Sequence, residues 1–337
     1  MRWHTGAFRK FMALVLLGIT LAAVPAWANH TQSRPVLVYM LANETDGAFI
    51  DSARKGAELA RHDFKIDYKE YRLRGRDNVL ITIDQLARDG YSPIISVGYQ
   101  SVMPVLQLAD KYPKTHFIVV DGLVPPLFNN VRSIIFKDHE GAFLIGMLAA
   151  YSTKTNTLGF IGGIDIPLIR NFAHGYAQGV KRVDPNINLV IDMIGDDNTA
   201  WSNTPKAYKL ANAQYANGAD VIFAAAGGAG LGVLQAAKDN EKLAIGVDAN
   251  QNGVQPGYVL TSLVKRVDVA VYKTLEMVEK EHWSHGIQYL GLKDGALDFS
   301  VDKNNRMLIN QDALERVMTA KEHIINGLID VEMYSPR

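Results

Sequence analysis

Residues 220–248 read DVIFAAAGGAGLGVLQAAKDNEKLAIGVD, and this stretch decides the fold class. It begins with a strand expected at 220–225, in which residues 221–225 are continuously apolar, as is typical of a strand buried on both faces. A glycine-rich turn follows, and Leu231–Lys238 then carries apolar residues at helical spacing. Leu243–Val247 is a second apolar run of strand length. Strand, helix and strand in this order predict a parallel βαβ unit.

The same alternation extends from this unit in both directions and forms two successive series. Strands are expected at 35–41, 67–73, 93–97, 116–121, 131–136, 157–161, 189–194, 258–265 and near 298–301, and helices at 46–62, 77–89, 101–111, 138–152, 169–182, 204–217, 267–282 and 310–324. No linker rich in Pro, Gly or Ser separates the series, so we expect two lobes joined by short crossings near Phe136 and Val264.

The predicted division places residues 35–136 and about 266–337 in a first lobe, and residues 137–264 in a second lobe. Open parallel sheets bind ligands beyond the carboxyl ends of their strands. Polar residues and glycines gather at those ends, at 43–46, 98–101, 121, 162–165, 227–232 and 248. Turn formation alone also favours these residue types, so position by itself does not assign a role to any one of them.

The first 28 residues have the layout of a secretory signal peptide. Three basic residues precede the short apolar run Phe11–Val24, and Ala26-Trp27-Ala28 supplies the small residues of a cleavage site. We expect cleavage after about Ala28 and a mature protein outside the cytoplasm. An uncleaved membrane anchor is the alternative interpretation of this segment.

The amino-acid composition limits the cellular location and the classes of binding partner that are expected. The chain has no cysteine, which excludes disulfides, a thiolate nucleophile and acylation of a cysteine as a lipid anchor. Basic and acidic residues number 35 each, so no basic excess favours a nucleic-acid partner. No coiled-coil heptads are present. We expect a monomer of the bacterial periplasm, free of a lipid anchor.

Catalytic and cofactor motifs are weak. There is no GxSxG and no HExxH, and the nine histidines lack metal-ligand spacing, so neither a metal nor a cofactor is expected. The turn at 226–232 suits a backbone that approaches a ligand closely, but its spacing is GGxGxG and no Walker lysine follows. A pair of carboxylates acting as in a glycosidase stays an alternative at this point, because the distance between two carboxylates depends on the fold.

Several blocks occur in a telling order. They are DGAFIDSA at 46–53, FIVVDG at 117–122, EGAFLIGMLAA at 140–150, LGFIGG at 158–163, DVIFAAAGGAGLG at 220–232, AIGVD at 244–248 and LTSLVKRVD at 260–268. As an ordered set, covering roughly residues 36–285, they resemble the basic membrane protein family. This family consists of substrate-binding proteins typified by the bacterial purine nucleoside receptor.

The resemblance implies a type I periplasmic-binding-protein fold, with two Rossmann-like lobes hinged around a ligand cleft. It also implies capture of a small ligand, a purine nucleoside, for an ABC permease, and no enzymatic activity. The ligand-binding residues that it implies are Asp46, Phe49, Asp121, Trp201, Gly227, Asp248 and Lys265. Among them, Asp248 and Lys265 would hold the ribose hydroxyls, while Phe49 and Trp201 would stack on the base.

Two departures from the family pattern bear on this interpretation. Ile50 replaces the usual Asn beside the stacking Phe49, and the cysteine that carries the lipid anchor is missing. Two other functions stay open at this point. One is a nucleoside- or sugar-processing enzyme on a doubly wound fold, and the other is a ligand-dependent sensor that contacts a membrane partner other than a permease.

Overall fold

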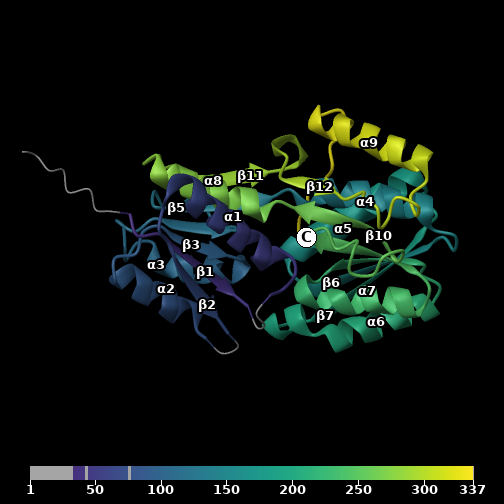
Figure 1. The fold of residues 1–337 in the computed structure, drawn as a ribbon, viewed down its shortest axis with the longest axis horizontal. Helices are drawn as coiled ribbons and strands as arrows, with labels where there is room; N and C mark the ends of the chain where they lie inside the picture. Colours follow the sequence, from purple (N-terminus) through teal and green to yellow (C-terminus); the bar gives the residue numbers. More distant parts are fainter. Residues whose placement is uncertain (1–32, 42–44, 75–76, 337) are drawn as a thin grey trace, which may run out of the picture. The chain divides into compact units, whose positions relative to one another are not determined.

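The computed structural model describes residues 33–41, 45–74 and 77–336. The predicted signal peptide lies outside these residues. The described part contains two parallel or nearly parallel six-stranded sheets, each covered by helices on both faces (Figure 1). We call the two sheets with their helices the first and second lobe.

The first lobe is built mainly from the N-terminal series. Its elements are β1 (Val36–Met40), α1 (Phe49–Phe64), β2 (Lys69–Leu73), α2 (Val79–Arg88), β3 (Ile94–Val97), the 3₁₀ turn η1 (Tyr99–Ser101), α3 (Val102–Leu108), β4 (Phe117–Val120), β5 (Val131–Phe136), α8 (Val267–Glu279) and β11 (Gly286–Leu290). Helices α1 and α8 pack together on one face of the sheet, while α2 and α3 pack together on the other.

The second lobe contains the series first recognised in the sequence. Its elements are α4 (Asp138–Ser152), β6 (Thr157–Ile164), α5 (Pro167–Val183), β7 (Asn188–Gly195), η2 (Asn198–Ser202), α6 (Thr204–Ala216), β8 (Val221–Ala225), η3 (Gly227–Ala229), α7 (Gly230–Asp239), β9 (Leu243–Asp248), β10 (Val259–Lys265), β12 (Leu297–Phe299) and α9 (Gln311–Ile325). Helices α4 and α5 form one layer, and α6 and α7 form the other.

The two sheets share one strand order. The first runs β11-β5-β4-β3-β1-β2 and the second runs β12-β10-β9-β8-β6-β7. All neighbours are parallel except β12, which is antiparallel to β10. In each lobe the chain therefore reverses direction across the sheet beside the first strand, and ligand sites form at such switch points.

The chain passes between the sheets three times. Two passages follow β5 and β10, beside the predicted crossings near Phe136 and Val264. The third connects β11 with β12 through the 3₁₀ turn η4 (Leu292–Asp294). The expected division placed all of about 266–337 in the first lobe, but β12 pairs with β10 and α9 packs on α4 in the second lobe. This pairing covers the edge of the second sheet.

Helix α4 is buried along almost its whole length. Every residue from Asp138 to Ala150 is buried, because this helix is apolar around its whole circumference and lies between β10, β12, α5 and α9. It approaches α5 closely where glycines replace side chains. At Gly179 an added Cβ would stand far inside van der Waals distance of the Phe143 carbonyl oxygen.

A Gly179→Ala variant is therefore expected to be destabilised. The clashing atom belongs to backbone, so it cannot rotate away, and overpacking of this kind costs about 1–3 kcal/mol of unfolding free energy. Urea unfolding of the variant checks this value. Gly228→Ala is the control, because its new methyl group would make only an ordinary contact with Trp201. Gly218→Ala is not suitable as a control, because the φ of Gly218 is positive and alanine would be strained there. Equal stability of Gly179→Ala and the wild type would contradict the packing described here.

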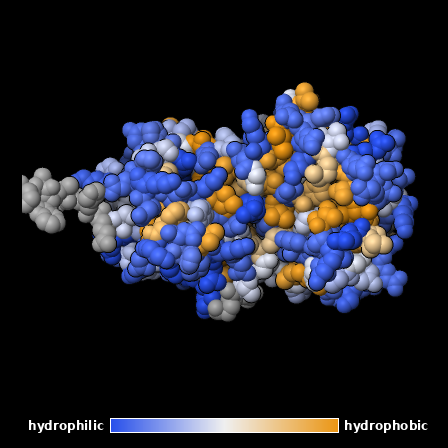
Figure 2. Space-filling view, turned by 45° about the horizontal axis from the view of Figure 1, so that its top comes forward, coloured by the Kyte–Doolittle hydropathy of each residue, from blue (hydrophilic) through white to orange (hydrophobic). Residues whose placement is uncertain are grey.

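The surface carries charged and apolar residues on different regions. Figure 2 shows apolar residues gathered toward the middle of the visible face, while hydrophilic residues dominate elsewhere. Within the part of the chain that the structure describes, no helix combines the length and apolarity needed to span a bilayer.

Candidate functional site

A cavity of about 430 Å³ lies where the carboxyl ends of the strands in both lobes converge. The first lobe contributes the ends of β1, β3 and β4 and the start of α1. The second lobe contributes α5, η2, η3 and the ends of β9 and β10. This volume is in the range of small-molecule sites in proteins.

The seven residues that the resemblance implied as ligand-binding come together here. The cavity is lined by Asp46, Phe49, Asp121, Trp201, Gly227, Asp248 and Lys265, among others. They come from six separate segments of the chain, so their convergence is a property of the fold. Their contact with a ligand stays a prediction.

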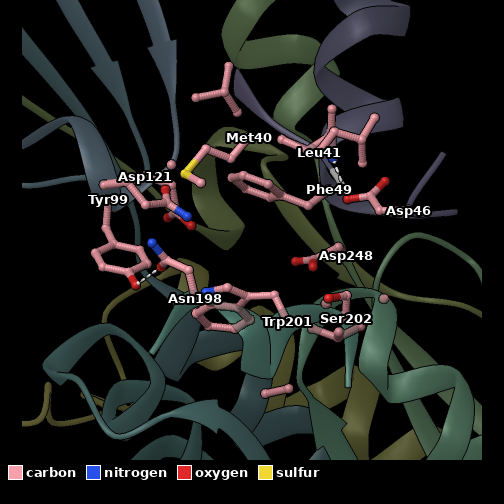
Figure 3. Close-up of a pocket in the computed structure, with 18 of the residues that line it drawn as sticks. Met40, Leu41, Asp46, Phe49, Tyr99, Asp121, Asn198, Trp201, Ser202 and Asp248 are labelled. Carbon is pink, nitrogen blue, oxygen red and sulfur yellow. Dashed lines mark hydrogen bonds between the residues drawn. The ribbon is translucent and has the colours of Figure 1, made fainter. Parts of the chain in front are cut away.

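Two aromatic side chains form opposite walls of the cavity. Figure 3 shows Phe49, from the start of α1, on one side and Trp201, from η2, on the other, with open space between them. The Trp201 ring lies against Gly163 of β6, where any side chain would collide with it. Glycine at 163 thus leaves the space that the indole occupies.

A buried cluster of charges occupies one end of the cavity, centred on Lys265. This lysine ends β10 and is only 1% exposed. Its Nζ donates to Asp121 Oδ2 at 2.7 Å and to Asp138 at 3.2 Å. Asp121 follows β4 in the first lobe, whereas Asp138 begins α4 in the second. The ammonium therefore connects the two lobes.

Three aromatic rings also surround the ammonium. Lys265 Nζ lies 4.9 Å from the Phe136 ring centroid, 5.2 Å from that of Phe172 and 5.5 Å from that of Phe49. Ring faces attract a cation at such distances. A ligand that stacks on Phe49 would thus lie beside the charged cluster.

The pKa values follow from burial and from neighbouring charges. Burial alone lowers the pKa of Lys265, but the carboxylates of Asp121, Asp138 and Asp248 together raise it above its usual value. Burial raises the pKa of Asp248 to about 7, against the opposing effect of Lys265. Burial likewise raises the pKa of Asp138 well above the usual range. Lys265 is therefore charged at neutral pH, while Asp248 is partly protonated.

Asp121 and Asp248 occupy equivalent places, at the ends of the fourth strand of each lobe. Both have a left-handed backbone, with φ of 64° and 66°. This conformation is uncommon for residues other than glycine and tends to occur at functional sites. Among the described residues, the Asp248 carboxylate has no hydrogen-bond partner, whereas Asp121 is bound to Lys265.

Asp46 has a local structural task as well as a place in the cavity. Its carboxylate accepts hydrogen bonds from the backbone N–H groups of Ile50 at 2.8 Å, Ala48 at 3.0 Å and Asp51 at 3.2 Å. These are free donors at the start of α1, and an acid placed there stabilises the helix. Asp46 thereby fixes the helix turn that presents Phe49 to the cavity.

The predicted role of Gly227 depends on its backbone. Its φ is 55°, which favours glycine, and a Cβ added at this position would lie 3.6 Å from Trp201. The glycine-rich turn therefore supports the indole and keeps the cavity free of side chains on that side. This packing role is enough to explain a glycine at position 227, and no nucleotide-binding motif is needed to account for it.

Two residues that the structure places at the site had no role assigned from the sequence: Tyr99 lies within the strand-end group 98–101, and Asp138 was not singled out. Tyr99, after β3, donates its hydroxyl hydrogen to Asn198 Oδ1 at 2.7 Å, and its ring centroid lies 6.2 Å from that of Trp201. Figure 3 shows this bond beside the cavity, between the two lobes. Asp138 was missed because an acid in the first turn of a helix is common for reasons of helix stability. For Tyr99 the signal was its place in the strand-end group 98–101, which did not indicate a partner in the other lobe.

Two α/β lobes around a cavity of this kind are the architecture of solute-binding proteins. A family model described as "ABC transporter substrate-binding protein PnrA-like" (Bmp) matches residues 36–333. The chain belongs to this family. It is accordingly a substrate-binding protein of the ABC transporter type, as the resemblance in the sequence predicted, and the family acts outside the cytoplasm.

Relatives of the chain carry related descriptions. An ABC transporter nucleoside-binding protein of Lactococcus lactis subsp. cremoris is 32% identical over 262 residues, which are 72% of each chain. An uncharacterized lipoprotein of Pyrococcus furiosus is 31% identical over 307 residues, covering 87% of this chain and 77% of the relative. The latter is named a lipoprotein, whereas this chain contains no cysteine that could be acylated.

Solved structures confirm the predicted fold class. An ABC transporter solute-binding protein of Aeropyrum pernix K1 superposes with a TM-score of 0.80 at 26% identity, covering 90% of this chain and 94% of the other. A periplasmic ribose ABC transporter structure from Conexibacter woesei has a TM-score of 0.63 at 9% identity, a likeness of fold alone.

Within the described ranges, no group of three or more potential metal ligands was found.

Proposed function

We propose that the protein binds a purine nucleoside between its lobes, presents it to an ABC permease and does not convert it. The observation that carries this proposal is the pair of aromatic walls, Phe49 and Trp201, beside a buried set of acids and one lysine. A flat base suits the space between two rings, because aromatic faces stack on π-systems. The nucleoside-binding relative supports the same ligand class.

The charged end of the cavity suits a ribose. Asp248 presents a buried carboxylate to the cavity, and two vicinal hydroxyls can donate to its oxygens. Lys265 has three N–H groups, of which two point to Asp121 and Asp138. The third can donate to a ribose oxygen. A phosphate at this end would meet carboxylates, which selects against nucleotides.

Ile50 predicts a relaxed choice of base. This buried side chain lines the cavity beside Phe49 and offers no hydrogen-bonding group to a ring edge. Selection among bases needs such groups. We therefore expect adenosine, guanosine and inosine to bind within about tenfold of one another, a spread of roughly 1.4 kcal/mol.

A ligand panel tests the proposed function directly. Nucleosides, free bases, pentoses and nucleotides are screened by thermal shift, and hits are measured by titration calorimetry. Nucleosides alone should raise the melting temperature strongly. A response only to a pentose, an amino acid or a nucleotide would exclude the nucleoside assignment. Chromatography of a long incubation with inosine should recover inosine, and appearance of free hypoxanthine would indicate an enzyme.

Tyr99→Phe should weaken retention of the nucleoside. It removes only the hydroxyl that donates to Asn198, so the lobes lose a contact at the mouth of the cavity. Because this bond is solvent-exposed, we expect a cost near 0.5–1.5 kcal/mol, or roughly two- to tenfold faster dissociation. Stopped-flow Trp201 fluorescence measures the rate. Tyr71→Phe, an exposed tyrosine of the same lobe, serves as the control and should dissociate at the wild-type rate.

We propose further that the mature protein is a monomer of the periplasm without a lipid anchor, with the signal cleaved after about Ala28. The absence of cysteine supports this, because no thiol is available for acylation. Osmotic shock should release the protein, and light scattering should give the mass of a single chain. Recovery only with detergent, or N-terminal sequencing that begins at Met1, would contradict the proposal.

A further inference from the structure

Asp138 is a buried acid that lies outside the cavity yet contacts the site. It is the first residue of α4, directly after the passage from β5, and its exposed fraction is 0%. It does not line the cavity, whereas Lys265 and Asp121 do. Its carboxylate is 3.2 Å from Lys265 Nζ. Asp138 therefore stands behind the lysine, on the side away from a ligand.

The surroundings of Lys265 show why a second acid is needed. Its Nζ lies among the rings of Phe49, Phe136 and Phe172, and water has almost no access to it. A buried ammonium in such a place is costly unless its N–H groups are paired. Two of the three N–H groups are taken by carboxylates, one from each lobe.

We propose that Asp138 is a positioning residue, which holds the Lys265 ammonium so that its third N–H faces the cavity. The proposal rests on the proposed function for the identity of the ligand. With two N–H directions fixed by Asp121 and Asp138, the tetrahedral ammonium has one direction left. Since Lys265 lines the cavity, a ligand oxygen can occupy that direction.

Removal of the Asp138 charge should have a consequence that loss of packing alone would not have. The charged groups that face Lys265 are Asp121 after β4, Asp138 on α4 and Asp248 at the end of β9. Burial lowers the pKa of Lys265, and these carboxylates counter it. In Asp138→Asn one of them is neutral, so the pKa of Lys265 falls and the ammonium is lost at lower pH.

The experiment measures adenosine affinity against pH, because adenosine has no group that titrates between pH 8 and 10. Asp138→Asn should bind about tenfold more weakly at pH 8, since a charge-assisted contact is lost. Its affinity should fall further toward pH 10, while that of the wild type stays flat. Asp138→Glu, which keeps the charge, should restore the flat profile. Asp268→Asn, in the first turn of α8 and paired with Arg266, is the control.

Two results would overturn the proposal. One is an Asp138→Asn profile parallel to the wild type between pH 8 and 10, and the other is an equal change in Asp268→Asn. The Lys265 ammonium is also followed by ¹⁵N NMR without ligand, and its titration should shift to lower pH in Asp138→Asn. This arm decides the inference even if adenosine fails to bind, an outcome that would exclude only the proposed function. Should the variant not fold, a wild-type ammonium that titrates below about pH 10 also overturns it.

Discussion

Lys265→Met is expected to lower the free energy of unfolding by about 3–5 kcal/mol at pH 7, the usual cost of removing one partner from a buried ion pair. The substitution leaves Asp121 and Asp138 buried without their cation. Urea unfolding measures the loss. The loss should shrink as pH falls, because the pKa of Asp138 is already raised by burial and protonation removes its charge. Lys280→Met, which removes an exposed lysine paired with Glu276, should cost at most about 1 kcal/mol.

A second variant separates charge from packing at the same place. Lys265→Met combined with Asp121→Asn and Asp138→Asn also removes the two acids that contact the ammonium. Asp248 is then the one acid of the cluster that stays, and burial already raises its pKa to about 7. Neutral replacements of a whole buried cluster are often close to neutral in stability. The triple variant should therefore recover most of the lost stability. If it is no more stable than Lys265→Met, the loss comes from packing and the electrostatic account is wrong.

Asp248→Asn is expected to weaken nucleoside binding by about 1.5–3 kcal/mol, or roughly 10- to 100-fold, since hydroxyl groups lose a charged acceptor. The same variant should make the free protein more stable at pH 8. Burial raises the folded-state pKa of Asp248 to about 7, so the wild type loses stability as pH rises from about 4 through 7. Asparagine cannot ionise and escapes this loss. The difference in urea midpoint between the two proteins should shrink as pH falls from 8 and vanish only near pH 4.

The pH dependence of binding tests the same assignment. If the ligand binds the ionised Asp248, wild-type affinity should increase roughly tenfold for each unit by which pH is raised toward 7. Above pH 7 the affinity should level off. Asp248→Asn should lose this rise. Asp110→Asn, which removes an exposed carboxylate in the turn after α3, should retain this rise. An Asp248→Asn affinity equal to that of the wild type would show that this acid does not touch the ligand.

The fold was predictable because most of its strands are continuous apolar runs followed by amphipathic helices. Residues 220–248 predicted β8, α7 and β9 to within one residue at each end. The strand β11 was missed because its alternating, partly exposed pattern is short and follows a polar turn. The place of the residues after 290 could not be predicted, because β12 has three residues and its pairing with β10 depends on tertiary contacts.

Residues that line the cavity were predictable where the type of side chain indicates its chemistry. Residues that act through a contact with another side chain were not predictable. Phe49, Trp201 and Asp248 face the cavity as the resemblance implied. Nothing in the sequence indicated that Lys265 would pair with Asp138, which is 127 positions away along the chain. Such pairs arise only when separate strand ends meet, so periodicity and spacing contain no signal for them.

The shared strand order has a consequence for how the molecule is made. Each sheet receives its sixth strand, β11 or β12, from the same short segment near the end of the chain. While the polypeptide emerges from the ribosome, the first sheet thus lacks its sixth strand until residue 290 is available, and the second sheet lacks its own until residue 299 is available. Contacts between distant parts of a chain slow folding. We therefore expect a nascent chain that stays unfinished in both halves, and a prematurely terminated one that leaves neither half intact.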